Sequence, residues 1–200
     1  MERESSTKLD GSLDQAIEEA LEETLALARF DGVIRAVGIS GSPRSPSKSK
    51  ALLQRLMESL ERYGAETKII DLAMMPAEAL VARGDSGEVD DALAVIGQAD
   101  IIAAASPTYR ALYTGVLKCF FDLMPQGHLV GKVCIGLQTG IAPQHALSAE
   151  YGFRPLFASL EGTPQAVLYA TDYEFEGSEP CAELKEKVRN IADAAVGAAG

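Results

Sequence analysis

The sequence predicts an α/β fold in which five parallel strands form a doubly wound sheet with helices on both faces. Short apolar runs alternate along the chain with segments whose apolar residues recur every three or four positions, a pattern typical of βαβ units. The runs are continuously apolar, as expected for strands that are covered on both faces. Because crossovers between parallel strands are right-handed, the strand order 2-1-3-4-5 is favoured.

The first expected strand, residues 33–39, is a β-branched apolar run bounded by Gly41 and Pro43. Residues 47–62 are expected to form a helix, because four leucines and a methionine recur there at helical spacing. The elements that follow are a strand at 66–72, a loop or short irregular helix at 73–87, and a helix at 89–98.

The fully apolar residues 101–105 form the third expected strand and lead into Ser106 and Pro107. The remaining elements are a helix at 114–124, a strand at 132–138 that ends at Thr139 and Gly140, a helix at 146–160, a strand at 165–170, and a helix at 181–196. Strands and helices thus alternate to the end of the chain, as parallel pairing requires.

Residues 1–31 are expected to be a polar N-terminal extension of a domain that spans residues 32–200. Apolar residues recur every four positions from Leu13 to Leu25, and glutamates occupy the other face. An amphipathic acidic helix is therefore predicted over 12–29. This helix either covers the domain's own core or contacts another subunit or a partner.

The net charge of −11 argues against nucleic acid and anionic membrane surfaces as partners, because both require a surplus of Lys and Arg. An anionic ligand therefore needs a local basic site. The three cysteines are widely spaced and odd in number, which favours reduced thiols over a disulfide framework or a metal site. The sequence contains no apolar run of signal-peptide or membrane-spanning length, so a cytoplasmic location is expected.

In an open α/β sheet, ligands bind beyond the carboxyl ends of the strands, where the strand order reverses. The loop after the first strand combines Gly41, which permits a tight turn, with hydroxyl groups and an arginine suited to phosphate oxygens. The candidate phosphate ligands are Ser42, Arg44, Ser47 and Ser49, with Lys48 and Lys50 adding to a basic patch at the start of a helix. The loop lacks the GKS or GKT of a P-loop nucleoside triphosphatase. The alternative to phosphate binding is an ordinary Ser/Pro-rich linker with a helix cap.

The loops after the third and fourth strands are expected to lie beside this one. Pro107 and the backbone of residues 108–110 can contact a flat heterocycle, with Thr139 and Gly140 close by. Tyr109 either packs on the ligand or is a surface aromatic residue. The sequence contains no Ser/His/Asp triad and no HExxH motif, and His128 and His145 are interpreted as structural histidines.

These motifs together resemble a known family. Gly41-Ser42-Pro43-Arg44, followed by Ser47 and Ser49, resembles the phosphate loop of the NAD(P)H-dependent FMN reductases. Ser106-Pro107-Thr108-Tyr109, followed by the residues GVLK at 115–118 and by Asp122, resembles the second signature of that family. Residues 108–125 and 151–160 are especially similar to the flavin reductases of two-component alkanesulfonate monooxygenase systems.

The resemblance implies a flavodoxin-like fold, FMN as the flavin, and NADPH or NADH as co-substrate. The phosphate would be held by the serines and the arginine of the first loop. The ring or ribityl chain would contact Pro107, Thr108, Tyr109, Arg110, Thr139 and Gly140. Reduced FMN would pass to a partner monooxygenase. Tyr113 matches a tyrosine that lies on a helix bulge at a tetramer interface, so a homodimer or homotetramer is expected.

Hydride transfer to a flavin needs no acid–base side chain, so neither a catalytic residue nor a metal site is assigned. Arg110 is a candidate for attracting NADPH phosphates or stabilising reduced flavin. Ile141 stands where the family commonly has a second glycine. Two alternatives remain open: an enzyme that retains FMN and reduces quinones, azo dyes or metal ions, and a non-enzymatic FMN-binding electron carrier or sensor.

Overall fold

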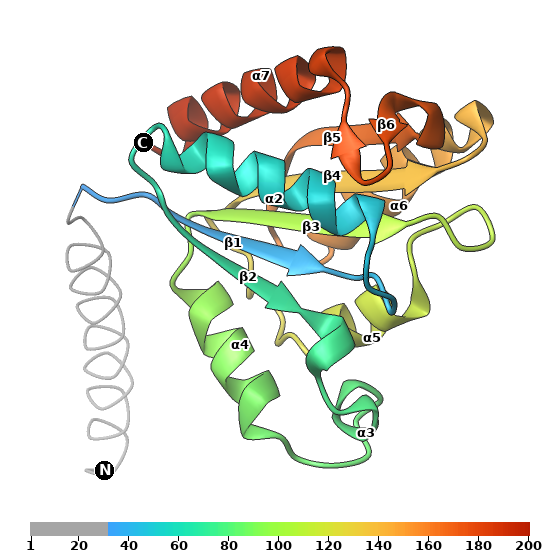
Figure 1. Ribbon diagram of the computed structural model, residues 1–200. Helices are drawn as coiled ribbons and strands as arrows, with labels where there is room; N and C mark the ends of the chain where they lie inside the picture. Colours follow the sequence, from blue (N-terminus) through green and yellow to red (C-terminus); the bar gives the residue numbers. More distant parts are fainter. Residues whose placement is uncertain (1–31) are drawn as a thin grey trace, which may run out of the picture. The chain divides into compact units, whose positions relative to one another are not determined.

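A computed structural model describes residues 32–200, in which five parallel strands are ordered β2-β1-β3-β4-β5 (Figure 1). The order and the all-parallel pairing confirm the predicted flavodoxin-like arrangement. The strands are β1 (Arg35–Ser40), β2 (Glu66–Asp71), β3 (Ile101–Pro107), β4 (Val133–Gly140) and β5 (Thr163–Thr171). The extension and its predicted helix at 12–29 lie outside the described residues.

The main helices fall close to the predicted positions: α2 (Lys48–Glu61), α4 (Gly87–Gly97), α5 (Gly115–Asp122), α6 (Ala146–Ala158) and α7 (Ala182–Ala199). The 3₁₀ turn η1 (Leu72–Met74) and the short helix α3 (Ala77–Leu80) occupy most of the first half of the segment where a loop or short irregular helix was expected, residues 73–87. The sequence did not predict the 3₁₀ turns η2 (Pro143–His145) and η3 (Asp172–Glu174), or a small hairpin formed by β6 (Phe175–Glu176) and β7 (Glu179–Pro180).

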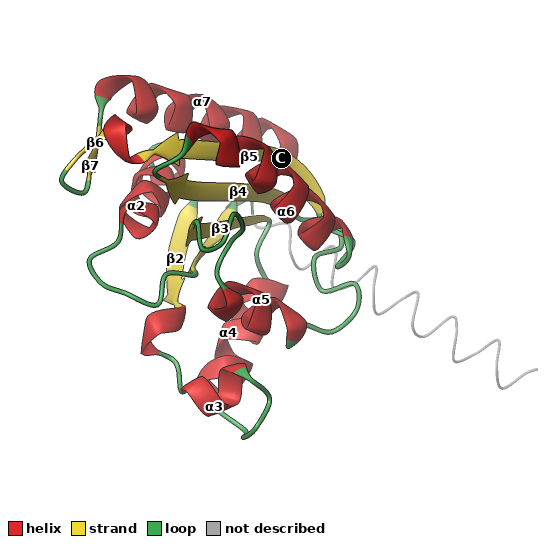
Figure 2. Ribbon diagram, turned by 90° about the vertical axis from the view of Figure 1, so that its right-hand side faces the viewer, coloured by secondary structure: helices red, strands yellow, loops and turns green. Residues whose placement is uncertain are grey.

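Helices cover both faces of the sheet, as the apolar strands predicted (Figures 1 and 2). On one face, α2 and α7 bury leucines such as Leu53 and Leu184 against the strands. On the other face, α4, α5 and α6 contribute Ile96, Phe120 and Phe153 to a second core. Burial on two faces explains why the central strand β3 is apolar from Ile101 to Ala105.

At the amino end of the sheet, Lys132 is nearly fully buried, and its ammonium group is hydrogen-bonded. Its Nζ donates to Gly97 O and Ala99 O, both at 2.8 Å, and so satisfies carbonyl groups at the end of α4. This lysine is a structural cap, far along β4 from the end where Thr139 lies.

Strand register brings three candidate loops to the same edge of the sheet. Ser40 of β1 pairs with Ala105 of β3, and Pro107 of β3 pairs with Thr139 of β4. Both β3 and β4 extend two residues beyond their predicted ends, so Pro107 and Thr139 are held by strand pairing and not by flexible loop. Among the described residues, no helix is long and apolar enough to cross a membrane.

Candidate functional site

The carboxyl ends of β1, β3 and β4 surround a surface cleft of about 350 Å³. Its position is that expected for a ligand in this topology, beside the point where the strand order reverses. The lining residues are Ser42, Arg44, Pro46, Ser47 and Lys48 after β1, Pro107, Thr108 and Tyr109 around the end of β3, Thr139, Gly140, Ile141, Ala142 and His145 around the end of β4, and Asp172 after β5. The three loops chosen from the sequence therefore form one site.

The loop after β1 is fastened to the loop after β3. The Gly41 N–H donates to Ala105 O at 2.8 Å, and Gly41 O accepts from Thr114 Oγ1 at 2.6 Å. The Thr114 N–H in turn donates to the buried Ser106 Oγ at 2.9 Å. A Cβ on Gly41 would lie 2.8 Å from Leu117 Cβ, so only glycine allows α5 to pack this closely.

The same loop leads directly into the N-terminus of α2. Ser42 closes a small turn, because its Oγ donates to Arg44 O at 2.9 Å and accepts from the Arg44 N–H at 3.2 Å. Ser47 is the N-cap of α2, and its Oγ lies 2.9 Å from Ser49 Oγ. The N-terminus of this 14-residue helix therefore lies at the cleft. The free N–H groups of its first turn favour binding of an anion there.

The basic patch expected from the sequence is only partly available to a ligand. Lys50 Nζ lies 2.6 Å from Asp71 Oδ2, and Lys48 Nζ lies 3.2 Å from Asp172 Oδ2. Arg44 is exposed and lines the cleft, and its guanidinium has no carboxylate partner within the described residues. Arg44 is therefore the cation of this loop that is ready to pair with an incoming anion.

A chain of hydrogen bonds joins the ends of β3, β4 and β5 under the cleft. The Thr108 N–H donates to Thr139 O at 2.7 Å, and Gln138 Nε2 donates to Thr108 Oγ1 at 2.8 Å. The Tyr169 hydroxyl on β5 donates to Ala142 O at 2.9 Å. Burial raises the pKa of Tyr169, with a smaller raising effect from Asp172 and a lowering effect from its hydrogen bond with Thr108. The hydroxyl therefore remains a proton donor at neutral pH.

Gly140 packs against this network, which leaves no room for a side chain at its position. A Cβ at this position would lie 2.5 Å from the Tyr169 hydroxyl oxygen and 2.8 Å from Thr108 Oγ1. Because real Cβ atoms do not approach other atoms so closely, a side chain here would displace Tyr169 or Thr108. The backbone of Gly140 consequently lies open to the cleft.

Arg110 lies at the tip of a tight turn and does not line the cleft. Tyr109 and Leu112 pair as a two-residue hairpin, in which Arg110 and Ala111 have φ values of 50° and 70°. Positive φ at both central positions is the geometry that usually selects Asn-Gly, so two residues with Cβ atoms are strained here. Arg110 is exposed in this turn, next to the cleft-lining Tyr109.

Tyr113 precedes α5 and is not part of a helical bulge. It is half-buried, and its ring centroid lies 5.4 Å from that of Phe153 on α6. The helix starts at Gly115 with Thr114 as its cap, so the expected bulge is not found at this tyrosine. Its ring covers one side of α6 close to Gly152.

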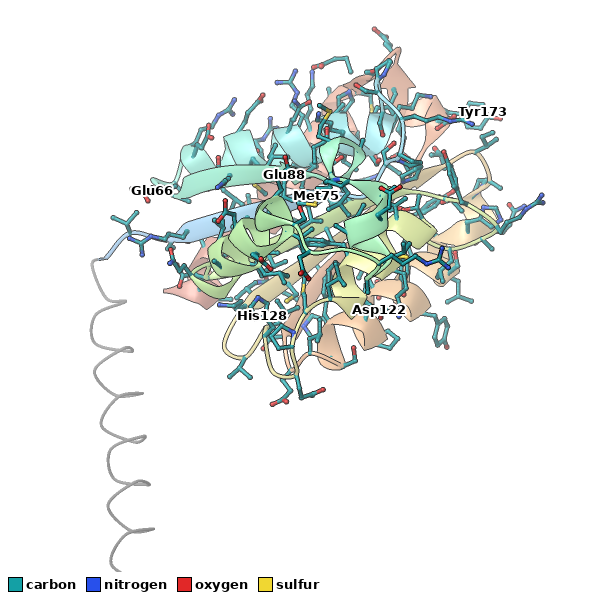
Figure 3. All side chains as sticks on the ribbon, turned by 90° about the horizontal axis from the view of Figure 1, so that it is seen from below. Glu66, Met75, Glu88, Asp122, His128 and Tyr173 are labelled. Atoms are coloured by element: carbon teal, nitrogen blue, oxygen red, sulfur yellow. The ribbon has the colours of Figure 1, made fainter. Side chains whose placement is uncertain are left out.

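The two histidines differ in position, and Figure 3 shows His128 well away from Tyr173, the residue after Asp172. His128 Nε2 lies 3.1 Å from Leu93 O, a structural contact with α4. His145 lines the cleft from η2, in the loop after β4 that was expected to lie beside the site. Ile141 is 68% exposed at the rim of the cleft.

Eight of the ten predicted contact residues thus line one cleft: Ser42, Arg44, Ser47, Pro107, Thr108, Tyr109, Thr139 and Gly140. Ser49 and Arg110 are not among the lining residues: Ser49 is buried with its Oγ 2.9 Å from Ser47 Oγ, and Arg110 is exposed in the turn after Tyr109. Tyr169 and Asp172 were missed, because nothing in the local pattern of β5 and its following turn indicates which residues reach the neighbouring loops.

The cleft has two chemically different ends. We call the part lined by Ser42, Arg44, Ser47 and Lys48 the α2 end, and the part lined by Pro107, Thr108, Thr139 and Gly140 the β4 end. The α2 end offers helix N–H groups and a guanidinium, which suit a phosphate. The β4 end offers a proline, a glycine and backbone groups on paired strands, which suit the face and edge of a flat ring. These donors fit FMN, which joins a phosphate to a heterocyclic ring.

Comparison with known proteins identifies the family. Residues 34–193 match the family described as NADPH-dependent FMN reductase. The chain belongs to the NADPH-dependent FMN reductase family. An Escherichia coli relative described as FMN reductase (NADPH) is 36% identical over 129 residues, which cover 64% of this chain and 68% of the relative. The Pseudomonas putida NADH-dependent FMN reductase SfnF is 36% identical over 150 residues, covering 72% and 81%.

A solved structure of another FMN reductase agrees with this membership. The apo form of an NADH:FMN oxidoreductase, EMOB, superposes with a TM-score of 0.73 at 29% identity, covering 81% of this chain and 88% of that one. The resemblance stated from the sequence motifs is therefore confirmed, both for the FMN reductase family and for the flavodoxin-like fold. Since residues 34–193 include every residue that lines the cleft, the whole candidate site lies inside the matched region.

Proposed function

We propose that this protein is an NAD(P)H-dependent FMN reductase that binds FMN in the cleft at the carboxyl ends of β1, β3 and β4. The observation that carries the proposal is the pairing of an anion site at the N-terminus of α2 with the open backbone of Gly140 in a single cleft. Both belong to a chain of the FMN reductase family.

The chain's own groups bind and orient, because FMN when bound supplies the electron-accepting chemistry and NADPH or NADH the hydride. Arg44 and the α2 N–H groups hold the phosphate. Pro107, Thr108, Tyr109, Thr139 and Gly140 contact the ring or the ribityl chain. Ser49 supports Ser47 from behind. Arg110, at the rim, is available to the phosphates of an incoming nicotinamide nucleotide.

We further propose that reduced FMN passes to a partner monooxygenase. Part of the support is the motif resemblance of residues 108–125 to reductases that serve such enzymes. The exposed rim residues Tyr109 and Ile141, which leave the cleft accessible, also favour an exchanged flavin. A homodimer or homotetramer in which Tyr113 lies at the interface, and a cytoplasmic location, complete the proposal.

The test is to purify the protein, titrate it with FMN, and follow NADPH and NADH oxidation with and without added FMN. The proposal expects FMN binding and oxidation of at least one nucleotide that depends on exchangeable FMN. Tightly retained FMN with reduction of quinones, azo dyes or metal ions would favour the FMN-retaining reductase. Flavin binding without nucleotide oxidation would leave the carrier or sensor.

A further inference from the structure

An ion pair connects the first residue of α2 to the turn after β5. Lys48 Nζ lies 3.2 Å from Asp172 Oδ2 and donates to Asp172 O at 3.4 Å. The same Nζ lies 5.7 Å from the centroid of the Phe175 ring in β6. Figure 2 shows the β6–β7 hairpin beside α2, and both charged residues of the pair line the cleft.

The turn that carries Asp172 is anchored by several hydrogen bonds. The turn η3 begins with a capping box, in which Thr171 N–H and Oγ1 donate to Glu174 Oε2 at 2.7 and 3.0 Å. Lys187 on α7 pairs with the other oxygen of Glu174 at 3.4 Å. The turn that carries Asp172 is therefore anchored to its neighbours on both sides, and it places the Asp172 side chain at the edge of the cleft, beside Lys48.

Within the described residues that line the cleft, Asp172 is the sole carboxylate. It stands beside the α2 end, where the helix terminus and Arg44 attract an anion. A doubly charged phosphate bound at this end would compete with the Asp172 carboxylate for the ion pair with Lys48. Two anionic groups on one ammonium repel each other, and the repulsion is only partly screened because the pair is half-buried.

We propose that Asp172 sets how tightly the protein retains FMN, by competing with the flavin's phosphate for Lys48. This inference rests on the proposed function and extends it to flavin release. The competition weakens binding of the phosphate-bearing flavin and leaves the ring contacts at the β4 end unchanged. In a reductase that transfers its flavin to another enzyme, such repulsion of the phosphate would speed release of the flavin.

The test is to compare Asp172→Asn with the wild-type protein by fluorescence titration of FMN and of riboflavin, which lacks the phosphate. The FMN dissociation constant is expected to fall about three- to tenfold, as for removal of one repulsive charge near an anion site. The riboflavin dissociation constant is expected to stay the same. Stopped-flow release of FMN should slow in proportion, and the gain should shrink at high salt.

Asp122→Asn is the matched control, because Asp122 pairs with Lys118 on the exposed side of α5, outside the cleft (Figure 3). It changes the net charge equally, and both affinities should remain those of the wild type. Asp172→Ala provides a second variant and should also tighten FMN alone, since Lys48 is the side chain with which the Asp172 carboxylate pairs within the described residues.

Unchanged or weaker FMN binding in folded Asp172→Asn and Asp172→Ala would overturn the inference, as would an equal tightening of riboflavin. Failure of the wild-type protein to bind FMN would instead overturn the proposed function. The two failures are therefore distinguishable in one set of titrations.

Discussion

At the α2 end of the cleft, exposed and half-buried charges face a ligand, whereas at the β4 end partly buried hydrogen bonds hold the backbone. Arg44 is exposed and Lys48 already shares its charge with Asp172. Thr108, by contrast, is bonded to Thr139 by its backbone and to Gln138 by its side chain. The first kind of interaction is screened by salt and selects charge, and the second is insensitive to salt and selects shape.

This difference predicts that variants at the two ends will separate FMN from riboflavin. Loss of a charge at the α2 end should affect the flavin that carries a phosphate. Loss of a contact at the β4 end should affect both flavins alike.

Arg44→Gln is expected to weaken FMN binding about ten- to a hundredfold, since a charged hydrogen bond contributes about 1.5–3 kcal/mol. Riboflavin binding should not change. Arg62→Gln, which removes an exposed charge at the other end of α2, is the control and should leave both affinities intact. Isothermal titration with each flavin measures the effect, and equal losses for the two flavins would place the phosphate elsewhere.

Gly140→Ala should weaken FMN and riboflavin equally, about tenfold. The added Cβ would lie 2.5 Å from the Tyr169 hydroxyl oxygen, and relief of such overpacking typically costs about 1–3 kcal/mol. Gly115→Ala adds a methyl group at a position with open space around it and should change neither affinity. Fluorescence titration and thermal unfolding of both variants distinguish a local effect from a global one.

Tyr169→Phe removes the hydroxyl that donates to Ala142 O, a loss of about 1 kcal/mol, and should weaken both flavins about fivefold. Because burial raises the pKa of Tyr169, its hydroxyl is protonated throughout the neutral range. The difference from wild type should therefore be constant up to about pH 9 and decline only where the phenol ionises. Tyr63→Phe, which removes an exposed hydroxyl near Asp193 outside the cleft, is the control. A difference that varied between about pH 6 and 8 would contradict this role for Tyr169.

Lys132→Met should leave flavin affinity unchanged while lowering the free energy of unfolding by about 1–3 kcal/mol. The lysine caps carbonyl groups of Gly97 and Ala99 at the opposite edge of the sheet, and these would lose their donors. Urea unfolding measures the loss. A change in FMN affinity would show that the two edges of the sheet are coupled, and would contradict a purely local role for Lys132.

Much of the fold was predictable because a short, continuously apolar run is stable as a strand that is covered on both faces. The strands extended past their predicted ends at Pro107 and Gly140, since pairing with a neighbouring strand overrides the local turn signal. The hairpin after β5 was missed because its two strands are only two residues long and carry no alternating pattern.

The candidate site was predictable where one loop carries its own signal, as in the serines and arginine that follow Gly41. It was not predictable where a contact joins distant segments. Lys48 meets Asp172 across 124 positions of the chain, and Tyr169 reaches Ala142 across 27. The turn at Arg110 was not predictable, because positive φ at two ordinary residues is not indicated by their sequence.

The most direct test of the account is a paired fluorescence titration of the purified protein with FMN and with riboflavin at low and high salt. A phosphate held at the α2 end should make FMN bind more tightly than riboflavin, and added salt should narrow the difference in affinity by weakening FMN binding alone. Equal affinities for the two flavins at every salt concentration would contradict it, because the α2 end would then make no contact with a phosphate.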